Sequence, residues 1–178
     1  GPSEGLLVRS GEPSRLAVSL VSGNFFTVLG SSPELGRTLR TEDDHNRALP
    51  PLVLSHRVWR ERFGSDPSVV GAVVRLRLQE RTSFQVVGVM PGSFDVFTPA
   101  DAWSPVMAVQ PEWAGGRGCE CDLIGRLAPG TTAASALAEL QAIHENLAAE
   151  HPDQYRAMKV VMVPFLQSVL GDAGRASL

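Results

Sequence analysis

The 178-residue chain has few of the features that usually reveal a protein's chemistry. It has two cysteines, which excludes a disulfide-rich scaffold, and aromatic residues make up only 6% of it. Its 16 basic and 19 acidic residues give a net charge of −3, so it has no basic footprint for nucleic acid. No apolar run approaches the roughly 20 residues that a membrane-spanning helix needs. These absences exclude several classes of protein without indicating one.

The familiar catalytic motifs are also missing. The sequence has no Ser/His/Asp arrangement, no HExxH sequence, no Walker A motif and no Rossmann glycine pattern. The glycine-rich segment 115–118 is followed by neither a lysine–serine pair nor a helix, so it is not a phosphate cradle. We therefore name no catalytic, cofactor-binding or metal-binding residue, expect no cofactor, and predict that the chain is not an enzyme. The sequence identifies no binding residues either.

The two cysteines, Cys119 and Cys121, lie two residues apart. At that spacing both side chains would share one face of a strand, where a disulfide between them would be strained. A metal site would need more ligands at suitable spacing, and only carboxylates are near. We interpret the pair as small hydrophobic residues or free thiols at the start of a strand.

The charged run Glu42 to His45 and two histidines are the remaining candidates for chemistry. A metal or acid–base role for the run would need a second cluster, and none is visible, so we interpret it as a solvated loop. His56 lies in the first turn of a predicted helix, where the helix dipole disfavours a cation, and a neutral surface role is expected. His144 lies on an apolar helix stripe and is interpreted as a packing residue.

What the sequence does have is a 43% hydrophobic fraction, enough for a proper core, and one well-marked hairpin. Residues 73–78 alternate aliphatic side chains with arginines, the polar segment 79–83 reverses the chain, and residues 84–89 return. Gly71 and Gly88 lie where a bulge or a close backbone approach is expected. We predict that this hairpin forms a rigid, two-stranded arm.

Local signals predict an α+β fold around this hairpin. Helices are predicted, from their caps and apolar spacing, at residues 25–29, 56–63 and 132–150. Strands are predicted at residues 15–22, 52–55, 122–127 and 159–163. The strand–helix–strand order at the C-terminal side is a βαβ-like unit whose crossover should be right-handed. Residues 94–105, with Phe97 and Trp103, are predicted to be a loop, and residues 1–3 resemble a cloning remnant.

Four stretches together resemble the periplasmic core domain of MacB-type ABC transporter permeases. The first contains Val-Ser-Gly-Asn-Phe-Phe and Glu-Leu-Gly-Arg (21–37), and the second Leu-Ser-His-Arg-Val-Trp and Asp-Pro-Ser-Val-Val-Gly (54–71). The third contains Val-Val-Gly-Val-Met-Pro-Gly (84–94), and the fourth Gly-Arg-Leu-Ala-Pro-Gly-Thr-Thr with its following helix (125–147). Each pattern is loose alone, but their order and spacing are specific. The sequence of these stretches also resembles that of the large single-chain permeases of the acidobacterial type.

The resemblance implies a domain inserted between the first and second transmembrane helices of a permease. A porter-like βαβ lobe would be formed by residues 4–71 and 119–178, and a strand-rich hairpin lobe by the inserted residues 72–118. The sheets would be mixed, with helices on one face. The domain would lie in the periplasm or another extracytoplasmic space of a bacterium, attached to its inner (cell) membrane.

The implied role is mechanical: the domain would transmit ATP-driven movement of the membrane helices to substrate or partner proteins during export. Its partners would be its own transmembrane helices, an ABC ATPase subunit, and a periplasmic adaptor or substrate protein, with a dimer in the full transporter. The outer domain of a lipoprotein-release or cell-division permease is the first alternative, distinguished by its partners. A stand-alone soluble binding module is the second, and it would need a concave pocket with convergent polar groups.

Overall fold

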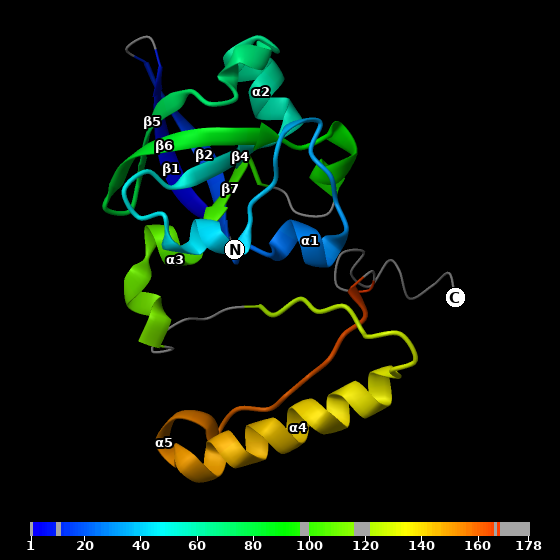
Figure 1. Cartoon of the computed structure of the whole chain (residues 1–178). Helices are drawn as coiled ribbons and strands as arrows, with labels where there is room; N and C mark the ends of the chain where they lie inside the picture. The colour runs from blue at the N-terminus through cyan, green and yellow to red at the C-terminus, as the bar shows by residue number, and fades with distance from the viewer. Residues whose placement is uncertain (1, 10–11, 97–99, 116–121, 166, 168–178) are drawn as a thin grey trace. The chain divides into compact units, whose positions relative to one another are not determined.

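The computed structural model describes residues 2–9, 12–96, 100–115, 122–165 and 167 (Figure 1). The chain divides into two compact units, Gly1–Leu123 and Ile124–Leu178. All the strands of the described residues belong to the first unit, and the longest helix belongs to the second. None of the described helices is long and apolar enough to span a membrane.

The first unit is built on one mixed sheet of seven strands. Its strands are β1 Ser3–Arg9, β2 Glu12–Val21, β3 Leu35–Gly36, β4 Pro51–Leu54, β5 Val73–Leu78, β6 Arg81–Val89 and β7 Ala102–Pro105. The order is β3-β6-β4-β7-β2-β1-β5, and an additional β5–β6 pairing joins the last strand back to the second. Six strands therefore form a closed ring, with β3 attached outside it to β6. Closure leaves those six strands without a long free edge.

The burial of the side chains on each face determines whether a strand has an alternating sequence pattern. The strand β5 alternates exposed and buried residues, because one of its faces is solvated. Every residue of β4 and β7 is buried, since both faces of these two strands are covered. Strands buried on both faces lack alternation, and short ones resemble any apolar segment. The hairpin β5–β6 was predicted correctly, and so were β2 and the fully buried β4, whereas β1, β3 and β7 were not.

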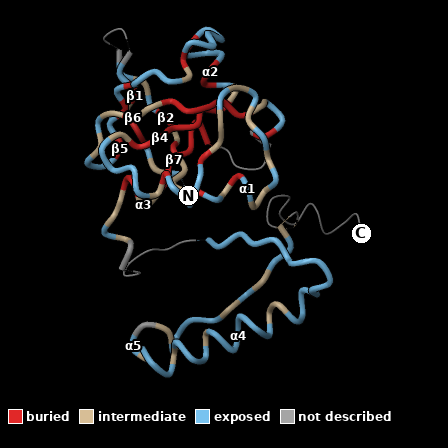
Figure 2. Tube along the Cα trace, viewed as in Figure 1, coloured by how far each residue is buried: buried red, intermediate tan, exposed pale blue. Residues whose placement is uncertain are grey.

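Two apolar clusters fill the first unit, as the buried segments in Figure 2 show. The first combines the inward-facing residues of the strands with Val58, Trp59 and Phe63 of helix α2 (His56–Phe63). The second packs Phe26 of helix α1 (Phe25–Leu29) against Trp103 and the outward-facing residues of the central strands. Figure 1 accordingly places α2 on one side of the sheet and α1 on the other.

The three predicted helices are confirmed, with the expected caps in the second and third. In α2 the Ser55 hydroxyl accepts a hydrogen bond from the Val58 amide, and Gly64 ends the helix in the left-handed conformation. Gly30 ends α1 in the same way. Helix α4 spans Ala133–Glu150, and the Thr132 hydroxyl caps it by accepting from the Ser135 amide. The short helices α3 Val106–Val109 and α5 Pro152–Tyr155 were not predicted.

Ser3 belongs to β1 and pairs with Val18 of β2, and the origin of residues 1–3 as a cloning remnant stays a prediction. Two predictions for the first unit are wrong. Trp103 is not in a loop: it is a fully buried residue of β7, whereas Phe97 lies outside the described residues. The hairpin is not a free arm, because β5 also pairs with β1 and β6 also pairs with β4. Its turn is also tighter than predicted, since Leu78 pairs directly with Arg81.

The second unit contains α4, α5 and two extended segments. The strands predicted at 122–127 and 159–163 are not formed in the described residues, where neither segment has a strand partner. An extended segment becomes a strand only by pairing its backbone groups with a neighbour. No residue of α4 is buried, and its side chains at positions 140, 143 and 147 are exposed (Figure 2).

The α+β class and the mixed sheet are confirmed. Within this chain the compact units meet at residues 123 and 124, whereas the sequence placed lobe boundaries near residues 71 and 119. Strands from both sides of residue 71 share the closed sheet, because β5 and β6 pair with β1 and β4. The porter-like and strand-rich lobes and their boundaries therefore stay a prediction.

The close approach at Gly88 gives a direct test of the sheet. A Cβ atom there would lie 2.1 Å from the Arg37 carbonyl oxygen, where β3 and the chain after it pass β6. We expect Gly88→Ala to lower the free energy of unfolding by about 1–3 kcal/mol in urea titrations, because the backbone must shift. At Gly125 an added Cβ meets nothing within 4 Å, so Gly125→Ala should cost less than about 0.5 kcal/mol. Equal losses would contradict this account of Gly88.

Candidate functional site

The described residues hold no group of three or more His, Cys, Asp or Glu side chains that could bind a metal ion. The sequence named no catalytic, cofactor or metal residue, and that prediction has no direct test here. Cys119 and Cys121 lie outside the described residues, as does most of the glycine-rich segment 115–118. Candidate function therefore depends on the charged groups and surfaces that remain.

The acidic run was predicted to be a solvated loop, and for Asp43 this is wrong. The run forms a 3-10 helix, Thr41–His45, in which Asp43 is buried. Two guanidinium nitrogens of Arg37 donate to its carboxylate, at 2.6 and 2.9 Å, and the Arg40 amide donates at 2.9 Å. A charge this well compensated can be buried at little cost. Asp43 is therefore a structural anchor, and its partner Arg37 is distant enough in sequence to have been missed.

Asp44 has a related structural role. Both of its carboxylate oxygens accept from the Gly23 amide, at 3.2 and 3.3 Å. Burial raises the pKa of this carboxyl above its ordinary value of 3.8, while the Gly23 hydrogen bond and nearby His45 oppose the shift. Gly23 is packed so tightly that an added Cβ would lie 2.2 Å from the Arg40 carbonyl oxygen. This contact fixes the start of α1 against the 3-10 helix.

The histidines and Asp101 are also held by neighbours. His56 Nδ1 lies 2.7 Å from the carboxylate of Glu34, a partner that the sequence did not indicate. Asp101 is buried and accepts from the Ala17 amide at 2.8 Å and from the Arg57 guanidinium. His144 lies half-buried on α4, as expected of a packing residue, although its Nε2 has no hydrogen-bond partner in the described part of the chain.

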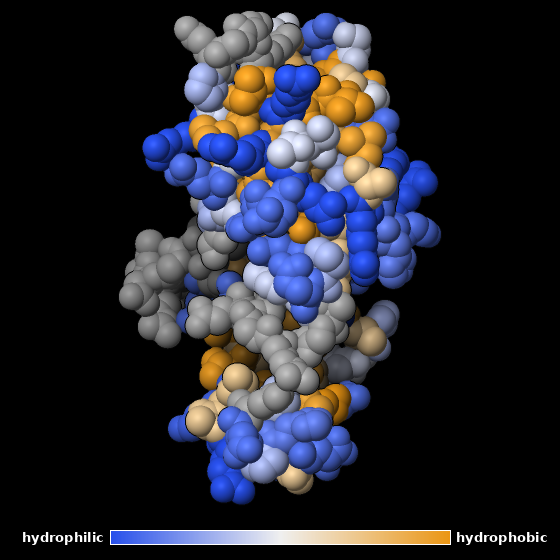
Figure 3. Space-filling view, turned by 90° about the vertical axis from the view of Figure 1, so that its left-hand side faces the viewer, coloured by the Kyte–Doolittle hydropathy of each residue, from blue (hydrophilic) through white to orange (hydrophobic). Residues whose placement is uncertain are grey.

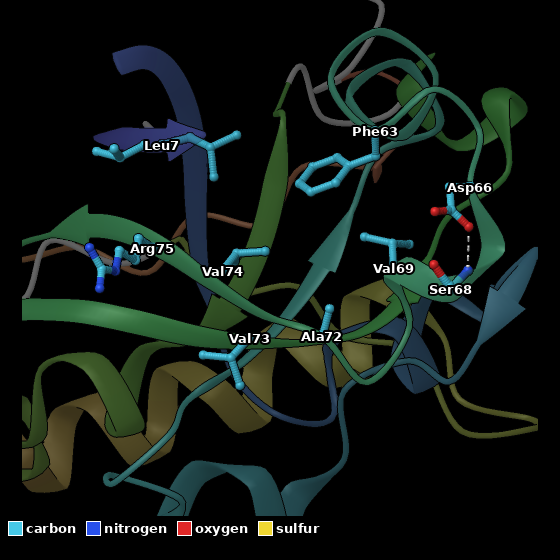
Figure 4. Close-up of a pocket in the computed structure, with 10 residues that line it drawn as sticks. Leu7, Phe63, Asp66, Ser68, Val69, Ala72, Val73, Val74 and Arg75 are labelled. Atoms are coloured by element: carbon cyan, nitrogen blue, oxygen red, sulfur yellow. Dashed lines mark hydrogen bonds between the residues drawn. The ribbon is translucent and has the colours of Figure 1, made fainter. Parts of the chain in front are cut away.

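The first unit carries a groove of about 370 Å³ between β5 and the turn after α2. Phe63, Val69 and Val74 point into it, Asp66 lies at one end, and Arg75 lies at the other (Figure 4). Val8 and Val73 line it too, with 44% and 58% of their surface exposed. Viewed from the side of β5 and β6, the upper surface shows hydrophobic side chains interrupted by strongly hydrophilic ones (Figure 3).

The second unit presents a larger apolar surface. Along α4, Leu140, Ile143 and Leu147 follow the spacing of one helix face, and all three are exposed. Elsewhere in the second unit, apolar side chains are exposed at positions 124, 127, 158, 161 and 163. A single exposed leucine needs no explanation, but a contiguous apolar surface usually marks a contact with another part or partner.

The model of the MacB-like periplasmic core domain matches residues 2–143, and the chain belongs to this family. It is thus a MacB-like periplasmic domain of an ABC transporter permease, as the four sequence stretches indicated. No curated protein matches the chain significantly.

Two solved structures resemble the chain in fold. The periplasmic region of MacB from Actinobacillus actinomycetemcomitans matches with a TM-score of 0.55 and 20% identity, over 83% of this chain and 66% of that one. A permease domain from Porphyromonas gingivalis matches with a TM-score of 0.52 and 19% identity, over 85% of this chain and 60% of that one. The chain thus spans less than two thirds of the length of these structures.

Removal of the Asp43 anchor should destabilise the first unit. We expect Asp43→Ala to lower the free energy of unfolding by about 2–3 kcal/mol in urea, because Arg37 keeps its charge and loses its partner. The neighbouring Glu42 is exposed, so Glu42→Ala should change it by less than about 0.5 kcal/mol. In a double-mutant cycle with Arg37→Ala, the combined loss should be smaller than the sum. Additive losses would show that the pair does not interact.

The raised pKa of Asp44 predicts a pH dependence with a definite sign. A carboxyl whose pKa is higher in the folded state contributes stability that is full below pH 3.8 and is lost as pH rises through the raised pKa. Asp44→Asn keeps an oxygen for the Gly23 amide and carries no charge. The variant should therefore gain stability relative to the wild type between about pH 3.5 and pH 7, as urea midpoints would show. A relative loss over this range would contradict the desolvation account.

Proposed function

We propose that this chain is a non-catalytic outer domain that transmits ATP-driven movement of the permease's membrane helices to substrate or partner proteins during export. Membership of the MacB-like family supports the transporter setting. The observation that carries the mechanical role is helix α4, which has no buried residue and an exposed apolar row at Leu140, Ile143 and Leu147. Such a helix is suited to receive force from a neighbouring part.

The neighbour that we propose for this row is the rest of the same permease. The chain covers only 66% and 60% of the two solved structures, so each of those domains has a substantial part without a counterpart here. The extended segments at 122–127 and 159–163 lack strand partners in the described residues and could pair with such a part. Their exposed apolar side chains, with those of α4, would then become a core.

The first unit is suited to pass the movement on to a substrate or partner protein. Its ring of six strands, filled by apolar side chains, resists bending because every ring strand is held on both sides. A domain that transmits movement needs such a rigid body together with a joint at which motion enters. We propose that motion enters through residues 124–178 and that the first unit moves as a body.

The wider assembly follows from the same proposal. The partners would be the permease's own transmembrane helices, its ABC ATPase subunit, and a periplasmic adaptor or substrate protein. The full transporter would be a dimer in the inner membrane of a bacterium, with this domain in the periplasm. The transported substrate is left open.

The row on α4 can be tested in the full permease. We expect Leu140→Lys/Ile143→Lys to abolish ATP-dependent movement of the domain, because two cations would be placed in an apolar contact. Movement would be measured as the change in distance between spin labels on the two protomers' first units, with and without a non-hydrolysable ATP analogue. Gln141→Lys/Asn146→Lys adds the same charge to exposed polar positions of α4 and should leave the movement intact.

The isolated chain provides the control for folding. Because Leu140 and Ile143 are 42% and 49% exposed, the lysine variant should lose less than about 1 kcal/mol of stability within residues 1–178. A much larger loss would show that the row packs within this chain and not against the rest of the permease. An unmodified permease whose label distances do not respond to the ATP analogue would overturn the mechanical role itself.

A further inference from the structure

The groove of the first unit combines two properties that the coupling role does not use. It has an apolar floor, formed by the buried side chains of Phe63, Val69 and Val74. Its rim bears Val8 and Val73, two valines whose side chains are exposed. A volume of about 370 Å³ is within the range of about 300–1,000 Å³ that ligand pockets have.

The backbone beside the groove favours an extended occupant. Strand β1 pairs with β5 only from Leu6–Val8 to Arg75–Arg77, in antiparallel register. Val73 and Val74 lie beyond the last of these pairs, and on their other side they pair with β6. The side of β5 that faces the groove therefore has no strand partner at these two residues within the described part of the chain. An extended peptide can add to such a short open edge and place alternate side chains in a pocket.

The charge beside the groove favours an acidic occupant. Arg75 and Arg77 lie two residues apart on the outer face of β5, where both are exposed. Neither has an ion pair among the described residues, whereas Arg15, the next arginine on this face, is paired with Glu4 at 3.1 Å. At the other end of the groove, the carboxylate of Asp66 already accepts from the Ser68 amide at 2.9 Å. The available charge is thus positive and lies along β5.

We propose that this groove binds an extended segment of a partner protein that carries aliphatic residues next to two acidic residues spaced i, i+2. The aliphatic side chains would fill the space between Phe63, Val69 and Val74, and the carboxylates would lie on the outer face of the sheet, toward the long side chains of Arg75 and Arg77. Arginine binds carboxylates in a planar, bidentate geometry. The two arginines would therefore select an occupant by both the charge and the spacing of its carboxylates. The groove lies wholly in the first unit, and the inference does not depend on the coupling role proposed above.

Fluorescence polarisation with labelled nine-residue peptides tests the proposal on residues 1–178. The probe is Gly-Ser-Val-Leu-Val-Asp-Ser-Glu-Gly, used also in reversed order because the direction of binding is open. We expect one order to bind with a dissociation constant below about 1 mM, and more weakly as salt is raised. A peptide with Lys-Ser-Lys in place of Asp-Ser-Glu should not bind, and replacement of Val-Leu-Val by Ser-Gly-Ser should weaken binding about tenfold.

Variants locate the site. Arg75→Glu/Arg77→Glu should weaken probe binding by about tenfold or more, because both changed residues are exposed and reverse the attraction. Arg156→Glu/Lys159→Glu changes the net charge of the chain equally, in the second unit, and should alter binding less than about twofold. Both variants should unfold at the same urea concentration as the wild type, which separates lost binding from lost folding. Amide chemical-shift changes on probe addition should concentrate in residues 63–77.

Several results would overturn the inference. They are the absence of binding by either acidic peptide up to about 1 mM, equal binding of the lysine peptide, or shift changes outside the groove. Groove shifts that depend on the protein's own concentration, without peptide, would identify a second copy of the chain as the occupant. Binding to anionic phospholipid vesicles, lost in Arg75→Glu/Arg77→Glu while peptides do not bind, would assign the arginines to a membrane surface. A failed peptide titration would leave the coupling role standing.

Discussion

The first unit depends on β6, the strand that joins its layers. It pairs with β3, β4 and β5, and without the β5 pairing the ring of six strands would be open. Its residues also contribute to both apolar clusters: Phe84, Val86 and Val89 to the first, and Val87 to the second. Only glycine fits at position 88, where the chain after β3 crosses within contact distance. Sheet closure, core packing and loop attachment therefore meet in one strand.

Local structure in this chain could be predicted from local signals. The Ser55 and Thr132 caps and the glycines after α1 and α2 mark helix ends by chemistry confined to a few neighbouring residues. The hairpin was equally clear, because its alternation reflects one solvated face. The strand β7 escaped prediction because Trp103 and Ser104 are both buried, which removes alternation, and Pro105 resembles a loop residue. Which elements cover each face of a strand depends on residues far away in the sequence. A short stretch of sequence therefore cannot reveal it.

The difference between local and long-range information also explains which roles of charged residues could be predicted from the sequence. The run Glu42 to His45 resembles a solvated loop until Arg37 and Gly23 are placed beside it, since both partners are supplied by other parts of the chain. Conversely, Arg75 and Arg77 resemble ordinary solvated residues of an amphipathic strand. They acquire a possible role only because Phe63 and Val69 lie beside the same strand in the folded unit. Residue type in this chain predicts charge, whereas the fold decides whether the charge has a partner.

The two units differ in how far their apolar side chains are covered within the described residues. In the first, two buried apolar clusters and the closed sheet form within about 120 residues, so the unit can be displaced without losing its shape. In the second, an 18-residue helix and two extended segments leave apolar side chains exposed, so its stability must depend on what it contacts. A force acts through contacts that cost free energy to break, and in the proposed coupling role such contacts with the rest of the permease form at the exposed apolar side chains of the second unit. The exposed apolar side chains of residues 124–178 are therefore the physical basis on which the proposed coupling role rests.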